Sequence, residues 1–132
     1  MRRLLFPLLL IFIVASALSG CSSGAASTDG AAQAVQSYLQ ALSAKDAAKL
    51  ANLSCKTWES QATMELDSFQ AVATTLKDVA CKQTGTDGSN TLVTCTGQIV
   101  ATYNGENQNL DLSGRTYLVT QQGGEWLVCG ER

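Results

Sequence analysis

Cysteine is the residue type whose number and spacing in this sequence point most directly to chemistry. The 132-residue chain has five cysteines and no histidine, so it lacks the commonest general base and metal ligand. The four cysteines after Cys21 are far apart: Cys55, Cys81, Cys95 and Cys129. A zinc site is the competing interpretation, but it would need closely spaced ligand pairs. We therefore expect disulfides, with no metal and no cofactor.

Carboxylates and tyrosines are the remaining candidates for acid–base chemistry. Asp111 is expected on a strand, pointing away from the core, and Asp46 is expected to cap a helix. Tyr38 is expected on an inner helix face, where it either faces a pocket or forms one hydrogen bond in the core. Solvated side chains are the simpler interpretation of three acids on one predicted helix surface: Glu59, Glu65 and Asp67. The sequence has no Ser-His, Cys-His, HExxH, P-loop or GxGxxG pattern, so we predict no catalytic residue.

The N-terminal segment has the features of a signal peptide. Two arginines precede a fifteen-residue apolar run from Leu4 to Leu18, shorter than the roughly 20 residues of a spanning helix. The run ends in Leu18-Ser19-Gly20-Cys21, which resembles the lipobox of bacterial lipoproteins. The resemblance implies that the Cys21 thiol carries a diacylglyceryl group and that cleavage leaves Cys21 as the N-terminus. An ordinary secretory signal peptide and an uncleaved anchor are the alternatives.

This interpretation of the N-terminus predicts domain boundaries and localisation. Residues 1–20 are the expected signal peptide, residues 21–30 a lipidated cysteine and flexible tether, and residues 31–132 one folded domain. Two or more acyl chains anchor a protein stably, so we expect it in the cell envelope, on the extracytoplasmic side of a membrane. An even number of cysteines in an exported domain is typical of two disulfides.

Hydrophobic periodicity predicts an α+β domain. Helical spacing covers residues 31–44, a short helix follows Asp46, and the helical pattern continues from Trp58 to Leu76 as one helix or two. Alternation then predicts strands at 79–84, 91–103, 110–121 and 125–129, separated by turn residues that include Asn104-Gly105. We expect N-terminal helices packed on a curved four-stranded antiparallel meander sheet.

The predicted hairpin turns fix a register that reaches the cysteines. A turn centred on Gly88 places Cys81 opposite Cys95, and directly paired antiparallel residues lie within disulfide range. We therefore predict a Cys81–Cys95 disulfide and, by elimination, a Cys55–Cys129 disulfide. A one-residue bulge would change this register.

The same register predicts an apolar group on the sheet face away from the core. Its members are Leu92, Tyr117, Val119, Trp126 and Val128. An apolar group framed by polar side chains suits an interface with a protein partner or a second copy of the chain. The competing interpretation is that a helix or a terminal segment covers this face.

Two segments resemble the nuclear transport factor 2-like (cystatin-like cone) superfamily. Residues 34–53 resemble its opening helices, with Ala44-Lys45-Asp46 at the step into the second helix. Residues 123–128 resemble its final hairpin, a Gly-rich turn followed by Trp126 and aliphatic residues. The resemblance, over about residues 31–130, implies a curved sheet wrapped around a long helix, with a pocket at the open end of the cone. This fold hosts enzymes, carriers and interaction domains alike.

These observations favour a membrane-tethered extracytoplasmic lipoprotein that acts as a non-catalytic binding or interaction module. The alternative is a small SnoaL-like enzyme, an isomerase, cyclase or hydratase; two or more buried acids with perturbed pKa values would favour it. The expected partners are the membrane, through the lipid on Cys21, and a protein partner or a second copy of the chain. A net charge of −2 argues against nucleic acid.

Overall fold

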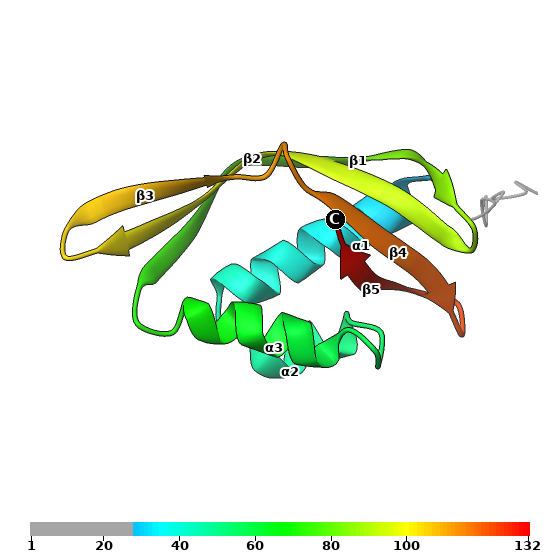
Figure 1. Ribbon diagram of the computed structural model, residues 1–132, viewed down its shortest axis with the longest axis horizontal. Helices are drawn as coiled ribbons and strands as arrows, with labels where there is room; N and C mark the ends of the chain where they lie inside the picture. Colours follow the sequence, from blue (N-terminus) through cyan, green and yellow to red (C-terminus); the bar gives the residue numbers. More distant parts are fainter. Residues whose placement is uncertain (1–27) are drawn as a thin grey trace, which may run out of the picture.

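Three helices followed by five strands make up the part of the chain that the computed structural model describes, residues 28–132 (Figure 1). The helices are α1 (Thr28–Ser43), α2 (Ala47–Asn52) and α3 (Glu59–Ser68). The strands are β1 (Ala73–Asp87), β2 (Asn90–Tyr103), β3 (Glu106–Asp111), β4 (Thr116–Gln122) and β5 (Glu125–Glu131). The helices lie on one side of a curved antiparallel sheet, which confirms the predicted α+β class.

Only the last residues of the predicted N-terminal segments fall within the described part of the chain. The signal peptide and Cys21 lie outside the described residues. Helix α1 begins at Thr28, so the last three residues of the segment expected as a tether belong to a helix. Within residues 28–132, no helix has the length and apolar character needed to cross a membrane.

Helix α1 supplies the central layer of the core. Its predicted apolar stripe, Val35, Tyr38, Leu39 and Leu42, is fully buried. The helix packs along β1 and also contacts β2, β4 and β5, so the sheet wraps around it. This is the layout that the superfamily resemblance implies.

The two shorter helices follow the sequence pattern in part. Asp46 caps α2 as predicted, because its Oδ1 accepts a hydrogen bond from the backbone N–H of Lys49 at 3.0 Å. The prediction that helix continues to Leu76 is wrong, because α3 ends at Ser68 and β1 begins at Ala73. Val72, Thr74 and Thr75 are β-branched, and such residues favour strand over helix.

A bulge bends the long β1–β2 hairpin. The register shifts between Lys77 and Ala80, and Asp78 has a φ of 53°. Gly97 lies opposite the bulge with a φ of +95°, and a Cβ there would stand 2.5 Å from the Asp78 carbonyl oxygen. The sheet can bend here only because residue 97 has no side chain.

The predicted third strand is two strands. Tyr103 pairs with Glu106 across the Asn104-Gly105 turn, as predicted, but β3 ends at Asp111 and β4 begins at Thr116. Both strands pair with β2, and the segment between them holds one residue more than the facing segment of β2. The sheet therefore has five strands instead of four, and β4 is shifted by one residue from the predicted register.

This shift moves most of the predicted interface into the core. Tyr117 pairs with Val93 and Val119 with Thr91, so their side chains point toward the helices. A one-residue slip exchanges the two faces of a strand. Tyr117, Val119 and Val128 are consequently buried, and Trp126 packs against the core. Of the predicted group, only Leu92 stays on the outer face, where it pairs with Leu118.

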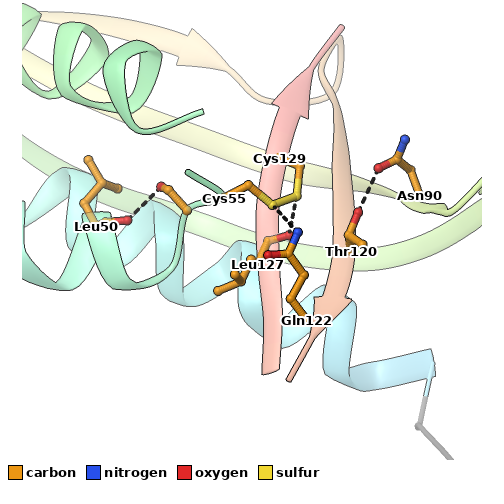
Figure 2. Close-up of a disulfide and its surroundings, with 8 residues drawn as sticks. Leu50, Cys55, Asn90, Thr120, Gln122, Leu127 and Cys129 are labelled. Atoms are coloured by element: carbon orange, nitrogen blue, oxygen red, sulfur yellow. Dashed lines mark hydrogen bonds between the residues drawn. A yellow bond between two sulfur atoms is a disulfide. The ribbon is translucent and has the colours of Figure 1, made fainter. Parts of the chain in front are cut away.

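Both predicted disulfides are present. Cys81–Cys95 joins directly paired residues of β1 and β2, as the register predicted. Cys55–Cys129 joins the segment after α2 to β5, and Gln122 at the end of β4 donates to the Cys55 sulfur (Figure 2). Ser54 forms a parallel bridge with Val128, so the segment after α2 covers the edge of β5. The helical half and the last strand are therefore linked both covalently and by backbone hydrogen bonds.

Candidate functional site

A polar pocket opens between α3 and the ends of β4 and β5. Its volume is about 420 Å³. We call it the mouth pocket, and its lining residues are Trp58, Gln61, Met64, Glu65, Ser68, Arg115 and Glu131. The residues come from the helical half and from the open end of the β4–β5 hairpin, so the closed fold is needed to assemble them.

Arg115 forms the electrostatic centre of the mouth pocket. One guanidinium nitrogen, Nη1, lies 2.8 Å from Glu65 Oε1 and 3.4 Å from Glu131 Oε2. Burial lowers the pKa of Arg115, but the hydrogen bond to Glu65 and the charge of Glu131 raise it above its ordinary value. The guanidinium is therefore permanently charged and held between two carboxylates.

Tyr38 and Trp58 support this ion-pair cluster from the core. The Trp58 indole N–H donates to the Tyr38 hydroxyl at 3.2 Å, and the Tyr38 hydroxyl donates to Glu65 Oε2 at 3.3 Å. Burial and the negative charge of Glu65 raise the pKa of Tyr38. The phenol therefore stays protonated, and it fixes the orientation of the Glu65 carboxylate.

Tyr117 is the one buried side chain among the described residues whose polar atom has no hydrogen-bond partner. Its ring centroid lies 6.3 Å from that of Tyr38. Burial raises the pKa of Tyr117, and the charges of Glu131 and Arg115 act on it in opposite directions. The hydroxyl therefore lies beside the charged groups of the mouth pocket, close enough for Arg115 to act on its pKa both through charge and as a hydrogen-bond donor.

The Glu131 carboxyl of the mouth pocket has a shifted pKa. Burial raises the pKa of the Glu131 carboxyl, Arg115 opposes this change, and the neighbouring Glu65 charge adds to it. The net result is a raised pKa on a carboxyl that lines an open pocket. Groups of this kind are candidates for ligand binding or for proton transfer.

Metal binding is not supported by the described residues. They contain no group of three or more Cys, Asp or Glu side chains placed to hold an ion. The Asp111 carboxylate is exposed and accepts a hydrogen bond from the backbone N–H of Ser113 at 2.8 Å, which lowers its pKa. Asp111 is therefore a solvated strand residue at the end of β3, as expected.

A second, more apolar groove lies on the other side of α1. It has a volume of about 450 Å³ and lies between α1, α2 and β5, with Trp126, Leu53 and Leu127 among its lining residues. The ring of Trp126 lies so close to Gly30 that a Cβ at residue 30 would stand 2.5 Å from its Nε1. This groove has no cluster of charged groups comparable to that of the mouth pocket, so we place the candidate site in the mouth pocket.

Most of this site has no distinctive signal in the sequence. Tyr38 was a candidate and does lie under the mouth pocket, but Glu65 was expected to be solvated and its side chain is only 19% exposed. Arg115 and Glu131 come together because the register of β4 and β5 shifts between Leu118 and Val119. This shifted register places Tyr117 opposite Glu131. No sequence motif marks Glu65, Arg115 or Glu131. The only indication in the sequence is that a charged residue, Arg115, directly follows Gly114.

Comparison with known proteins adds little. The chain matches no protein-family model, and a search of curated proteins finds no match. A solved structure titled Rd1NTF2_05, whose title continues with five substitutions, is similar over 76% of this chain and 92% of the other. The two share 16% sequence identity, with a TM-score of 0.45.

Proposed function

We propose that this protein is an extracytoplasmic lipoprotein with a nuclear transport factor 2-like domain, anchored in the cell envelope through a lipid on Cys21. The mouth pocket is the binding site of this domain, which acts as a non-catalytic binding module. Two kinds of observation support the proposal, one for the localisation and one for the binding role.

The localisation is supported by the lipobox resemblance and by cysteine chemistry. Disulfides persist in oxidising compartments, and both predicted bridges are formed. The test is fractionation of cells expressing the chain or its Cys21→Ser variant. We expect membrane retention of the parent chain and release, or failed processing, of the variant. Membrane retention of a correctly cleaved Cys21→Ser chain would contradict the lipid anchor.

The binding role rests chiefly on the way the charges of the mouth pocket are fixed. Arg115 holds Glu65 at 2.8 Å, and Tyr38 holds the second oxygen of the same carboxylate. A carboxylate bound on both oxygens is a poor general base, because proton uptake would break these contacts. A fixed cluster of donors and acceptors in an open pocket instead favours recognition of a ligand.

The SnoaL-like enzyme remains the second candidate because of Glu131. Its carboxyl has a raised pKa, and it faces the pocket beside the Tyr117 hydroxyl. Glu131 would be the proton acceptor in such an enzyme. Glu131 would supply one of the two perturbed acids that such an enzyme is expected to need.

Native mass spectrometry of the full chain purified from its own envelope tests the binding role. We expect a bound small molecule that is recovered unchanged. Ser68→Trp should fill the pocket and abolish this mass, whereas Thr63→Trp, an exposed residue of α3 outside the pocket, should leave it. Conversion of the recovered compound by the parent chain, lost in Glu131→Gln, would favour the enzyme instead.

A further inference from the structure

The negative charge of the mouth pocket is only partly neutralised. The pocket contains two carboxylates and one guanidinium, and the guanidinium is closer to Glu65 than to Glu131. Among the described residues, Glu131 accepts one side-chain hydrogen bond, the 3.4 Å contact from Arg115. The Glu131 carboxylate is therefore the group in this pocket with the greatest remaining capacity to accept hydrogen bonds.

A buried tyrosine lies next to Glu131 in the sheet. Tyr117 is 1% exposed and its hydroxyl has no partner. Tyr117 pairs with Glu131 between β4 and β5, and Arg115 acts on the pKa of the phenol both through its charge and as a hydrogen-bond donor. Buried hydroxyls are nearly always hydrogen-bonded in native proteins. Tyr117 itself does not line the mouth pocket, so the acceptor that a ligand would meet there is Glu131.

The apolar walls of the pocket suit an organic cation. Trp58 lines the pocket, and its hydrogen bond to Tyr38 holds the indole in place. Met64 lines the same pocket and is 56% exposed. A tryptophan near carboxylates attracts ammonium and guanidinium groups through its ring and their charge together. An anionic ligand would instead meet the repulsion of Glu65 and Glu131.

We propose that the mouth pocket binds a small organic cation, with its ammonium or guanidinium group against Glu131 and its alkyl part along Trp58 and Met64. This inference rests on the proposed binding function, and it specifies the class of ligand. The pocket volume of about 420 Å³ lies within the range of small-molecule sites. The cation is either a free amine or the side chain of a lysine residue, and the two sources share the same contacts.

Isothermal titration calorimetry of the full chain in detergent tests the proposal. The probes are butylammonium, cadaverine, butyrate, butanol and a lysine amide that is acetylated on its α-amine, so that its side-chain ammonium stays charged. We expect saturable one-site binding of the cations and none of butyrate or butanol. A stronger signal from the lysine amide than from cadaverine would identify a lysine side chain as the natural cation, and the reverse would identify a free amine.

Two variants, each with a matched control, locate the site. Glu131→Gln keeps the shape of the side chain and should weaken cation binding about tenfold or more. Glu106→Gln makes the same charge change at the exposed β2–β3 hairpin and should leave binding unchanged. Ser68→Trp should abolish binding while Thr63→Trp retains it.

Three results would overturn the proposal. Equal cation affinity in the parent chain and Glu131→Gln would remove the residue on which it rests. A second result is that the parent chain binds butyrate or butanol but no cation, and that Ser68→Trp abolishes this binding. It would refute the cation class while leaving the binding function intact. Absence of binding by every probe, together with no co-purified ligand, would refute both.

Discussion

Trp58 donates its indole N–H to the Tyr38 hydroxyl across 3.2 Å, which joins the start of α3 to the middle of α1. Trp58→Phe removes this donor and leaves the Tyr38 hydroxyl with Glu65 alone. We expect a loss of about 1 kcal/mol in the free energy of unfolding, the usual contribution of such a hydrogen bond. Urea denaturation of Trp58→Phe, Tyr38→Phe and the double variant measures the coupling. Strict additivity of the two changes would show that the bond contributes nothing.

Gly97→Ala is expected to destabilise the sheet strongly. The residue has a φ of +95°, and a new Cβ would stand 2.5 Å from the backbone oxygen of Asp78. Strain and overpacking together should lower the free energy of unfolding by about 3 kcal/mol. Gly114→Ala is the matched control, because a Cβ there meets no atom within 4 Å, and it should change stability by less than about 0.5 kcal/mol. Similar effects of both changes would contradict the role given to Gly97.

Removal of the two disulfides should have unequal effects. The Cys55–Cys129 bridge closes a sequence separation of 74 residues and the Cys81–Cys95 bridge one of 14. Chain entropy then predicts losses of about 4.5 and about 3 kcal/mol in the respective double Cys→Ala variants. Chemical denaturation of each variant at constant pH checks the order. A larger loss for Cys81 and Cys95 would show that native contacts outweigh loop entropy.

The buried tyrosines predict a loss of stability at alkaline pH. Burial raises the folded-state pKa values of Tyr38 and Tyr117 above the ordinary value of 10.0. The folded state therefore keeps protons that the unfolded state releases, and this contribution to stability is full below about pH 10 and lost as the pH rises toward the folded pKa. In a Tyr103→Phe chain, these two are the only phenols left. Phenolate absorbance should then appear together with the loss of the circular dichroism signal; phenolate formation in a still folded chain would contradict the burial.

Trp126→Ala is expected to weaken packing rather than association. The indole packs against the core and touches Gly30 of α1. Because the residue is only partly buried, the expected loss is about 2 kcal/mol, below that of a fully buried tryptophan. Leu92→Ala, on the outer face of the sheet, should cost less. Thermal melts and sedimentation of both variants provide the check. An unchanged melt combined with dissociation of a dimer would instead support an interface at Trp126.

Features that depend on local sequence could be predicted. The α1 stripe needs only helical periodicity, the α2 cap needs only Asp46, and the hairpin needs only Asn104-Gly105. The Cys81–Cys95 pairing was also predicted, although the register shifts between Gln83 and Gly85, on the way from the turn to Cys81. Asp87 pairs with Asn90, so the turn is centred between Gly88 and Ser89 instead of on Gly88, and this offset cancels the shift.

Features that depend on an irregularity could not be predicted. The extra residue between Asp111 and Thr116 has no distinctive sequence, yet it reverses the faces of Tyr117 and Val119. The mouth pocket depends on that reversal, because it requires Tyr117 beneath the site and Arg115 and Glu131 beside each other. The charged cluster therefore follows from tertiary structure, and a solvated Glu65 was the natural expectation from the helix alone.

The two disulfides are nested, with Cys81–Cys95 inside the interval closed by Cys55 and Cys129. When the chain is synthesised and exported with its N-terminus first, Cys55 appears before Cys81, Cys95 and Cys129. Its native partner, Cys129, appears last of the three. Oxidation in order of emergence would join Cys55 to Cys81, which is the wrong pair. Native pairing requires that Cys55 stay reduced until β5 has been made, or that thiol–disulfide exchange correct the first bond. The maturation of this domain should therefore depend on an isomerase activity more than its small size suggests.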